Sequence, residues 1–534
     1  MMRKGSTILA LLLLAALDAA LAATAGAAHA DFSGRWALDA GRSSGLPPGF
    51  DETLVVTQDG DTMQVASTLV TDARDRIVEY VWTLGAGEQD VPPSFPGITA
   101  KVSKRTARWT GDRSLEVTDH VEGEGGGGPV TVDVVRQLQL AENGQTIVVE
   151  QEQTVSGFTS RSHRVFTHAA PGSAVPPIAA RMFPVDLRVP MPPTPFHSGG
   201  KTQLVYEVHA TSLRFGDLDW KRLDVLDAAG RTLASYEGKA LADLLLRPGA
   251  TGGEPQRIPA GTSAVAFVWL ALDGAPPAAL RHRATFGIPA SAAAPDRVVE
   301  GAPVAVRQPA LVLGPPVRGG DWIARWTGNG SFHRRGLMAV DGGARISQRF
   351  AIDWNREAPD GHEWTGKGDR NEQYAVFGQD VIAVADAEVA RVVDGIPLNQ
   401  PGSLNPAVTV GVDTAAGDSV SLRLPDGSYA VYAHLQPGSI VVKQGQRVRR
   451  GEVLGKIGNS GNATGPHLHF HVSSGPGLEG DGLPYAFDAF TVVGTEEGMP
   501  ADDGKWNGKR NAPREVRGEM PEEHMLVRFA DGRS

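Results

Sequence analysis

The stretch that decides the fold around it runs Gly465-Pro466-His467-Leu468-His469-Phe470-His471. It places three of the chain's 14 histidines at every second position. Side chains at alternate positions of an extended strand point to the same face. The three imidazoles therefore line one face of a predicted strand, and the apolar residues between them face a core. This pattern is typical of a metal-bearing sheet. The alternative, a surface strand with incidental histidines, suits one histidine better than three.

Length and composition indicate a large chain of short strands. With 534 residues it is too long for one core and predicts about two to four domains. Its 65 glycines and 37 prolines, with 6% aromatic residues, favour many strands joined by turns. The formal net charge of −10 gives no reason to expect a nucleic-acid partner. The sequence carries no oligomerisation signal.

The N-terminus has the pattern of a secretory signal. Two basic residues precede an apolar run over residues 8–17, and Ala28-His29-Ala30 supplies a small-x-small cleavage site. We expect removal of residues 1–30, a mature chain from Asp31, and export to the periplasm or the medium. The run is too short to suit a membrane span, and an uncleaved anchor is the alternative. No later segment reaches membrane-spanning length, so we expect no transmembrane segment after cleavage. The absence of cysteine excludes disulfides.

The exported chain is predicted to be all-β with three domains. Residues 31–170 carry β-rich runs separated by hairpin turns, which favours a small antiparallel barrel, with a sandwich as the alternative. Residues 196–288 are predicted to form an immunoglobulin-like sandwich, and residues 322–494 an antiparallel β domain that contains the histidine strand. The remaining segments are two linkers rich in proline, 171–195 and 289–321, and a polar tail, 495–534, in which only 525–529 favours a strand.

Four segments of the third domain belong together. They are Arg349-Phe350-Ala351-Ile352-Asp353, residues 378–389, Tyr432-Ala433-His434-Leu435 with the Val-x-x-Gly-x-x-Leu-Gly turn at 448–455, and Gly458-Asn459-Ser460-Gly461 leading into the histidine strand. In this order they resemble the LytM/lysostaphin-type zinc endopeptidases, peptidase family M23. The resemblance implies a compact antiparallel β domain with a groove over zinc. It also implies that the chain is a zinc endopeptidase and that its substrate is a peptide of bacterial peptidoglycan.

The resemblance also assigns roles to individual residues. It implies that Asp353 and His469 are zinc ligands. It implies that His434 and His467 flank the metal-bound water and the substrate carbonyl, as general base and oxyanion stabiliser. Zinc takes imidazole and carboxylate ligands, and a catalytic site leaves one position open for water. His471 is outside the family's ligand pattern, so we expect it to support a ligand or to face solvent.

One position departs from the family pattern. The family's first ligand is a histidine four residues before the aspartate, and Arg349 occupies that place here. A guanidinium is always protonated and cannot bind zinc. Either the site is broken or another residue supplies the ligand. In the groove, Arg349 would bind a peptide carboxylate or pair with Asp353; Arg349 and Tyr432 are our candidate substrate-binding residues.

His333 is our candidate for the missing ligand. The segment from His333 to Asp353 is predicted to be a hairpin with a three-residue loop, Asp341-Gly342-Gly343, which places His333 opposite Ala351. Opposed residues share a face, and Asp353 shares it diagonally. We therefore predict a zinc triad of His333, Asp353 and His469, whereas a one-residue register change would turn His333 away. The alternative is that His333 only caps or packs at the start of a strand.

Two other functions stay open. The first is a degenerate, non-catalytic M23-like domain that binds the cell wall or regulates a wall hydrolase. Retention of His434, His467, His469 and Asp353 favours the catalytic interpretation. The second rests on the start of the first domain, Asp31-Phe32-Ser33-Gly34-Arg35-Trp36, which resembles the Gly-x-Trp start of lipocalin-like barrels and implies a ligand carrier. For that domain we favour a structural or wall-contacting accessory role.

Overall fold

The computed structural model describes most of the chain after residue 28. The described ranges are 29–47, 49–71, 75–92, 95, 98–141, 143–168, 178–179, 183–214, 216–289 and 296–531. They fall into two compact units, the first ending at Ala174 and the second beginning at Val175. Nearly all of the predicted signal peptide lies outside these ranges. Within them, no helix has the length and apolar character needed to cross a membrane.

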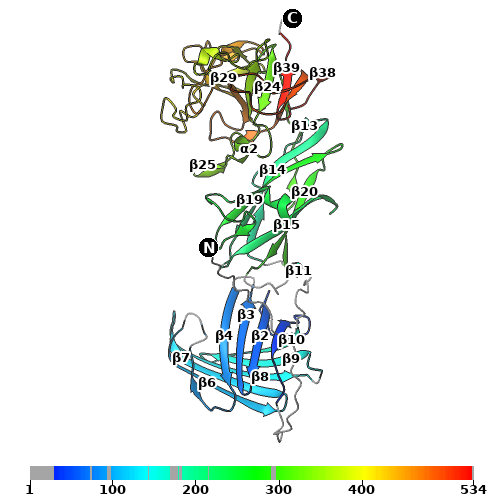
Figure 1. Ribbon diagram of the computed structural model, residues 1–534, viewed down its shortest axis with the longest axis vertical. Helices are drawn as coiled ribbons and strands as arrows, with labels where there is room; N and C mark the ends of the chain where they lie inside the picture. Colours follow the sequence, from blue (N-terminus) through cyan, green and yellow to red (C-terminus); the bar gives the residue numbers. More distant parts are fainter. Residues whose placement is uncertain are drawn as a thin grey trace, which may run out of the picture. The chain divides into compact units, whose positions relative to one another are not determined.

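The first unit is one antiparallel sheet of ten strands that curves into a half-barrel (Figure 1). Its order is β4-β3-β2-β1-β10-β9-β8-β7-β6-β5, so neighbours in the sheet are neighbours in the chain except where β1 pairs with β10. Trp36, Met63 and Phe166 are buried in its core. The strands are β1 (Gly34–Leu38), β2 (Asp51–Asp59), β3 (Thr62–Val70), β4 (Asp75–Thr83), β5 (Gln89–Asp90), β6 (Thr99–Gly111), β7 (Ser114–Gly125), β8 (Gly128–Leu140), β9 (Thr146–Val155) and β10 (Phe158–His168).

The second unit begins with a β-sandwich. One sheet has the order β11-β21-β20-β15-β16 and the other the order β12-β14-β19-β17. The long pair β14 and β19 is buried over most of its length rather than at alternate residues, which is typical of strands covered on both faces. The elements are β11 (Ile178–Ala179), β12 (Val185–Arg188), β13 (Phe196–Ser198), β14 (Lys201–Ser212), β15 (Leu218–Asp227), β16 (Thr232–Glu237), α1 (Gly238–Ala242), β17 (Leu245–Leu246), β18 (Arg257–Ile258), β19 (Ser263–Leu272), β20 (Ala279–Gly287), β21 (Arg297–Glu300) and β22 (Val304–Ala305).

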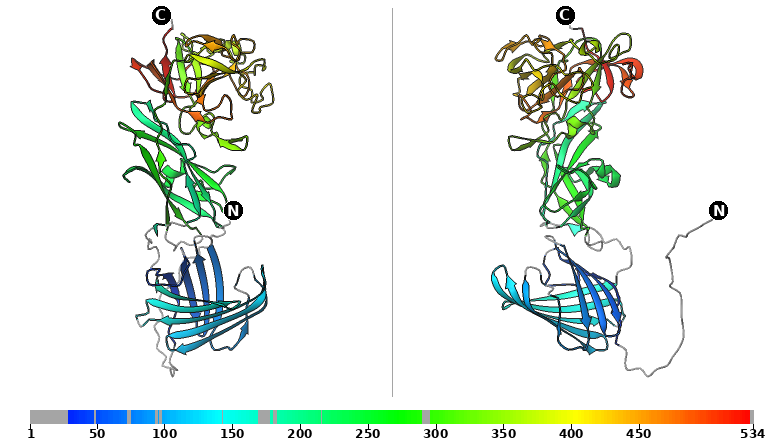
Figure 2. Two further views of the ribbon diagram at one scale, coloured as in Figure 1. Left: turned by 180° about the vertical axis from the view of Figure 1, so that it is seen from behind. Right: turned by 60° about the vertical axis from the view of Figure 1, so that its left-hand side comes forward.

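The C-terminal domain completes the second unit (Figures 1 and 2). Strand β13 of the sandwich contacts it, where the ring centroids of Phe196 and Phe350 are 5.5 Å apart. Its main sheet has the order β32-β29-β30-β31-β34-β27-β24-β39-β37-β38. The elements are β23 (Leu311–Leu313), β24 (Asp321–Arg325), α2 (Phe332–Arg335), β25 (Met338–Val340), β26 (Gly343–Arg345), β27 (Ile352–Glu357), the 3-10 turn η1 (Asn371–Gln373), β28 (Asp380–Ile382), β29 (Ala387–Val393), β30 (Asp418–Arg423), β31 (Tyr429–Leu435), β32 (Arg447–Val448), β33 (Val453–Lys456), β34 (Leu468–Ser473), β35 (Gly482–Leu483), β36 (Tyr485–Phe487), β37 (Phe490–Glu496), β38 (Gly508–Val516) and β39 (Met525–Arg528).

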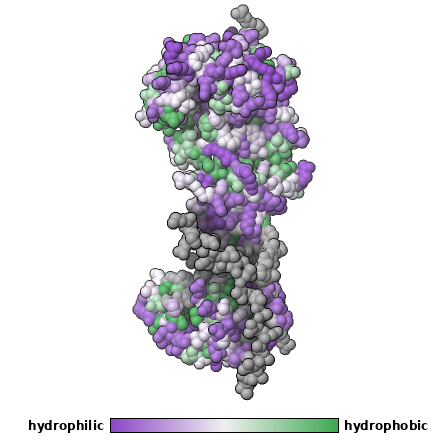
Figure 3. Space-filling view, in the orientation of Figure 1, coloured by the Kyte–Doolittle hydropathy of each residue, from purple (hydrophilic) through white to green (hydrophobic). Residues whose placement is uncertain are grey.

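The all-β, multidomain fold predicted from the sequence is confirmed. In the described part of the chain, helical structure is limited to α1, α2 and η1. The polar tail differs from expectation, because it forms β38 as well as β39 and both pair with β37. The visible face of the C-terminal domain is largely hydrophilic (Figure 3), and its apolar residues gather in one core that includes Trp354, Tyr432 and Phe470.

Strand β34 is the centre of this domain. Its core face carries Leu468, Phe470 and Val472, all buried in the main cluster, so its other face carries His469 and His471. It is hydrogen-bonded to β27 on one side and to β31 on the other. The histidine strand therefore lies between the strands that carry Asp353 and His434.

Candidate metal centre and active site

Asp353 and His469 lie directly opposite each other on β27 and β34. The Oδ1 atom of Asp353 is 2.8 Å from Nδ1 of His469. Both side chains are buried. The pairing register of the two strands therefore brings together the two ligands that the family resemblance implied.

His333 also lies beside Asp353 and His469, but it belongs to a different element from the one that we predicted. It lies in the four-residue helix α2, where Ser331 caps the first turn by accepting a hydrogen bond from the Arg334 amide. Its Nε2 atom is 3.6 Å from Oδ2 of Asp353, and its ring centroid is 4.8 Å from that of His469. The sequence thus identified a residue at the site but assigned it to the wrong element.

The hairpin behind that prediction is also shorter than expected. Val340 pairs with Gly343, so the loop has two residues, Asp341 and Gly342, and not three. Both loop residues have positive φ, 49° and 74°, as a type I′ turn requires, and Asp-Gly is a preferred sequence for that turn. The predicted pairing of His333 with Ala351 is therefore wrong.

His333, Asp353 and His469 have the composition of a zinc site. One ligand atom from each lies within 4.8 Å of the others. Burial lowers the pKa of His333 to about 4, so its imidazole is neutral at neutral pH. Burial opposes ionisation of Asp353, but the three neighbouring histidines hold the pKa of this carboxyl well below its usual range. Two imidazoles and a carboxylate are ligands that zinc accepts.

His434 enters the groove because β31 changes its alternation at its end. Regular alternation would place Tyr432 and His434 on the same face, and Tyr432 faces the core. A bulge interrupts the pairing of β31 with β30, and His434 has a φ of 62°, so its side chain turns to the groove beside that of Ala433. Its Nδ1 donates to the carbonyl of Ser460 at 2.8 Å, which leaves Nε2 as the basic nitrogen.

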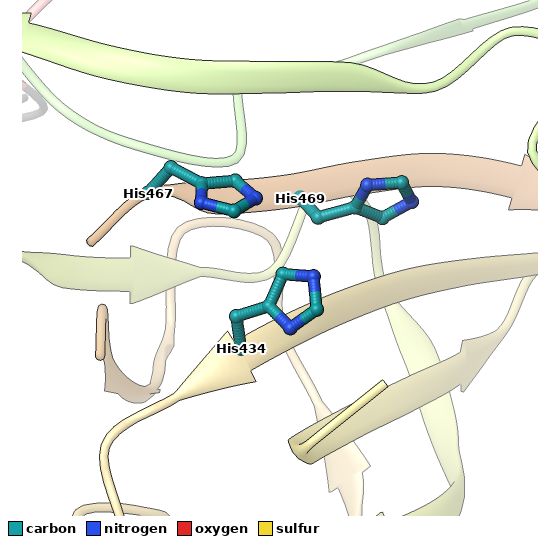
Figure 4. Close-up of side chains that lie close together, drawn as sticks. All are labelled: His434, His467 and His469. Carbon is teal, nitrogen blue, oxygen red and sulfur yellow. The ribbon is translucent and has the colours of Figure 1, made fainter. Parts of the chain in front are cut away.

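His467 lies beside His434 at the start of β34. Figure 4 shows the rings of His434, His467 and His469 gathered at one place. The ring centroids of His434 and His467 are 4.8 Å apart. Nδ1 of His467 donates to the Gly465 carbonyl at 2.8 Å, and its Nε2 lies 3.5 Å from Oδ1 of Asp353. Both histidines thus have a fixed ring orientation next to the ligand cluster.

His471 contacts the predicted ligand His469 and does not face solvent. It is buried, and its Nδ1 lies 3.0 Å from Nε2 of His469. It can accept the proton at Nε2 of His469, which would leave Nδ1 of His469, the atom nearest Asp353, to bind a metal.

The two candidate substrate-binding residues lie elsewhere. Tyr432 is fully buried in the core, where its hydroxyl accepts a hydrogen bond from the Val384 amide. Arg349 is also buried, and its guanidinium donates to Glu207 of the sandwich and to the Gly482 carbonyl. Both assignments are corrected: Tyr432 packs in the core on the face of β31 opposite the groove, and Arg349 forms an ion pair with Glu207 and not with Asp353.

The site opens into a groove of about 830 Å³ that includes all five predicted metal and catalytic residues. Trp326 and Phe332 form an exposed aromatic pair at its wall, with ring centroids 5.1 Å apart and exposed fractions of 40% and 56%. Sequence analysis missed both, although Phe332 is adjacent to His333. Trp364, Tyr374 and Met499 line another part of the same groove.

The antiparallel β domain thus brings two imidazoles and a carboxylate within 4.8 Å of one another, with two further imidazoles beside them, and this set could hold a metal ion. Residues 373–479 match the family model described as Peptidase family M23. The resemblance read from the motifs is therefore confirmed, and M23 peptidases are metallopeptidases. The match contains His434, His467 and His469 but begins after Asp353 and Arg349.

The chain is also similar to curated proteins over short segments. It is 30% identical over 122 residues to the cell division protein DipM of Caulobacter vibrioides, covering 22% of this chain and 17% of that one. It is 42% identical over 57 residues to the peptidoglycan DD-endopeptidase ShyA of Vibrio cholerae, covering 11% and 13%. Less than a fifth of either relative is thus spanned. Among solved structures, the catalytic domain of lysostaphin from Staphylococcus simulans is 20% identical, covering 26% of this chain and 71% of that one with a TM-score of 0.15.

Proposed function

We propose that this protein is an exported zinc endopeptidase that hydrolyses peptide bonds in peptidoglycan. The observation that carries the proposal is the convergence of His333, Asp353 and His469 on one point, with His434 and His467 beside it. The similarity to a peptidoglycan DD-endopeptidase supports the substrate class. The signal-like residues 1–30 support export to the periplasm or the medium.

His333, Asp353 and His469 would hold the metal. A bound zinc ion supplies a Lewis acid that polarises the scissile carbonyl and lowers the pKa of water. His333 is neutral because it is buried, and Asp353 is ionised, so neither ligand must lose a proton at neutral pH. His471 would hold the Nε2 proton of His469.

His434 and His467 would handle the protons of the reaction. Burial, with the neighbouring His467 and His469, holds the pKa of His434 well below its usual range, so its Nε2 begins as an acceptor. We assign His434 to take a proton from the attacking water at Nε2 and to return it to the leaving amine. We assign His467 to stabilise the negative charge that develops on the carbonyl oxygen.

The direct test is digestion of purified peptidoglycan by the mature chain from Asp31. We expect new peptide amino groups, identified by mass spectrometry of the released fragments. A chelator should abolish their release and added zinc should restore it. Asp353→Asn serves as the inactive control. Intact peptidoglycan after incubation with zinc-loaded protein would contradict the proposal.

A second function has one observation in its favour. Arg349 occupies the place of the family's first ligand, and its side chain is engaged by Glu207. A non-catalytic domain that binds the wall or regulates a wall hydrolase would tolerate that loss. In the same experiment, sedimentation of the protein with peptidoglycan without fragment release would support this alternative.

A further inference from the structure

Glu207 is a buried carboxylate that joins the sandwich to the C-terminal domain. It lies on β14 and is 2% exposed. It accepts hydrogen bonds from Arg349, whose Nη2 is 2.9 Å from Oε2 and whose Nε is 3.0 Å from Oε1. It also pairs with Arg334. Burial opposes its ionisation, but the two guanidiniums lower the pKa of Glu207 to about 2. One charged carboxylate of the sandwich therefore holds two cations of the neighbouring domain.

Each of these arginines is close in the sequence to a predicted metal ligand. Arg334 directly follows His333 in α2. Arg349 precedes Asp353 by four residues, in the segment that leads into β27. Without Glu207, Arg349 would keep the Gly482 carbonyl and Asp481, and Arg334 the Tyr206 carbonyl, but both segments would lose their charged partner in the sandwich.

The rest of the segment 329–349 also rests on the sandwich. Nη2 of Arg334 donates to the Tyr206 carbonyl at 3.0 Å, and Nδ2 of Asn329 donates to the Phe267 carbonyl at 3.0 Å. Ile346 packs in one small cluster with Phe267 and a valine of the same strand. These contacts explain why β14 and β19 are buried on both faces.

Helix α2 cannot fix the position of His333 alone. A helix of four residues is far below the length at which helices are stable by themselves. The Ser331 cap satisfies one backbone amide of helix α2. The position of the helix relative to β27 and β34 must be fixed by contacts with other parts of the chain. The structure offers the sandwich for that purpose.

We propose that the sandwich is part of the metal centre, with Glu207 as a positioning residue that holds His333 and Asp353 in place through Arg334 and Arg349. This inference rests on the proposed zinc site. It gives Arg349 a role at the position where the family has a ligand: the arginine anchors the strand whose aspartate binds the metal. Residues hydrogen-bonded to metal ligands typically change metal affinity by about 10- to 100-fold when mutated; Glu207 acts one contact further out, through the arginines, so we expect an effect at the lower end of that range.

The test compares zinc affinity, by competition with a chromogenic chelator, in the mature full chain and in Glu207→Gln. We expect zinc binding to weaken by about tenfold or more. The matched control is Ser198→Ala, which removes another buried hydrogen bond from the sandwich to the C-terminal domain, from Oγ of Ser198 to the Met520 carbonyl at 2.8 Å. It should bind zinc within about twofold of the wild type, because its contact leads to no ligand.

A second readout needs no metal. Amide hydrogen exchange over residues 329–349 should accelerate in Glu207→Gln and stay unchanged in Ser198→Ala. If Glu207→Gln fails to fold, Glu207→Asp decides, because it keeps the charge but is too short to hold both guanidiniums. Zinc affinity within twofold of the wild type, with unchanged exchange, would overturn the inference. A wild type that binds no zinc would instead overturn the proposed function.

Discussion

At the residue scale, the site depends on a few backbone positions that depart from regular strands. His434 has a left-handed φ, and its carbonyl accepts a hydrogen bond from the Gly458 amide at 3.0 Å. Such residues persist only where their surroundings hold them, and they gather at functional sites. The position of His434 thus depends on the loop that crosses behind it.

His434→Ala tests the proton-transfer role. Loss of a general base typically costs about 10²- to 10⁴-fold in rate, and His434 is not among the predicted ligands. We expect peptidoglycan cleavage to fall by that factor while zinc content stays at about one ion per chain. His197→Ala, on an exposed residue of β13, is the control for both measurements. Cleavage within threefold of the wild type would contradict the assignment.

Gly458→Ala tests the support behind His434. A Cβ at this position would lie 2.5 Å from the Leu435 carbonyl carbon, so the two backbone segments must separate. We expect a loss of about 1–3 kcal/mol in the free energy of unfolding. The control is Gly411→Ala in the same domain, where a Cβ meets its nearest atom at 3.9 Å. Equal thermal unfolding of the two variants would show that the close approach has no cost.

At the element scale, β34 shows what the sequence can predict. Its alternation of histidine and apolar residues correctly indicated a strand with a buried back, and its motifs indicated the family. Those features are local, so they can be read from neighbouring residues. The fold class and four of the five residues at the groove followed from them. The fifth, His333, was proposed from a hairpin register that the structure does not have.

The sequence did not predict side-chain positions and strand pairings that depend on contacts with other elements. Tyr432 follows strand alternation, but the bulge that reverses it before His434 depends on the pairing with β30. The turn at Asp341 and Gly342 admits loops of two or three residues, and the choice changes every pairing behind it. The burial of Arg349 depends on Glu207, which is 142 residues away in the chain.

The buried His282 of the sandwich should make the stability of the protein depend on pH. His282 on β20 is buried beside the Tyr206 hydroxyl at 3.0 Å, and burial lowers its pKa from 6.5 to about 4. Between these values the unfolded chain binds a proton that the folded chain does not, so stability falls as pH falls from 6.5 to 4. The full effect is about 3 kcal/mol.

His282→Gln should remove this contribution. We expect the loss of stability between pH 7 and pH 4.5, measured by urea unfolding, to be smaller in the variant than in the wild type. Comparing the two proteins isolates His282 from the other buried histidines, which remain in both. An identical pH dependence would show that His282 titrates normally when folded.

At the scale of the whole molecule, the two compact units have different relations to the site. The first unit has a core of its own residues, and we propose that it is an accessory domain. The second unit contains the sandwich and the C-terminal domain, which share one hydrophobic cluster through Phe196 and Val205. The smallest functional part is therefore expected to be the second unit and not the family-matched segment alone.

Truncation tests that expectation. A chain of residues 175–534 should fold and bind about one zinc ion, because it keeps β14, β19 and Glu207. A chain of residues 310–534 lacks them and should bind zinc at least about tenfold more weakly. Equal affinity in both truncated chains would contradict a role for the sandwich.

The most direct test of the proposed metal centre is the zinc content of two proteins, the mature chain from Asp31 and its His333→Ala variant. It is measured by elemental analysis after dialysis without chelator. We predict about one zinc per wild-type chain and far less in His333→Ala, with His362→Ala equal to the wild type as a control. A full zinc complement in His333→Ala would contradict the ligand assignment. A wild type well below one zinc per chain, and not restored by added metal, would contradict the catalytic site itself.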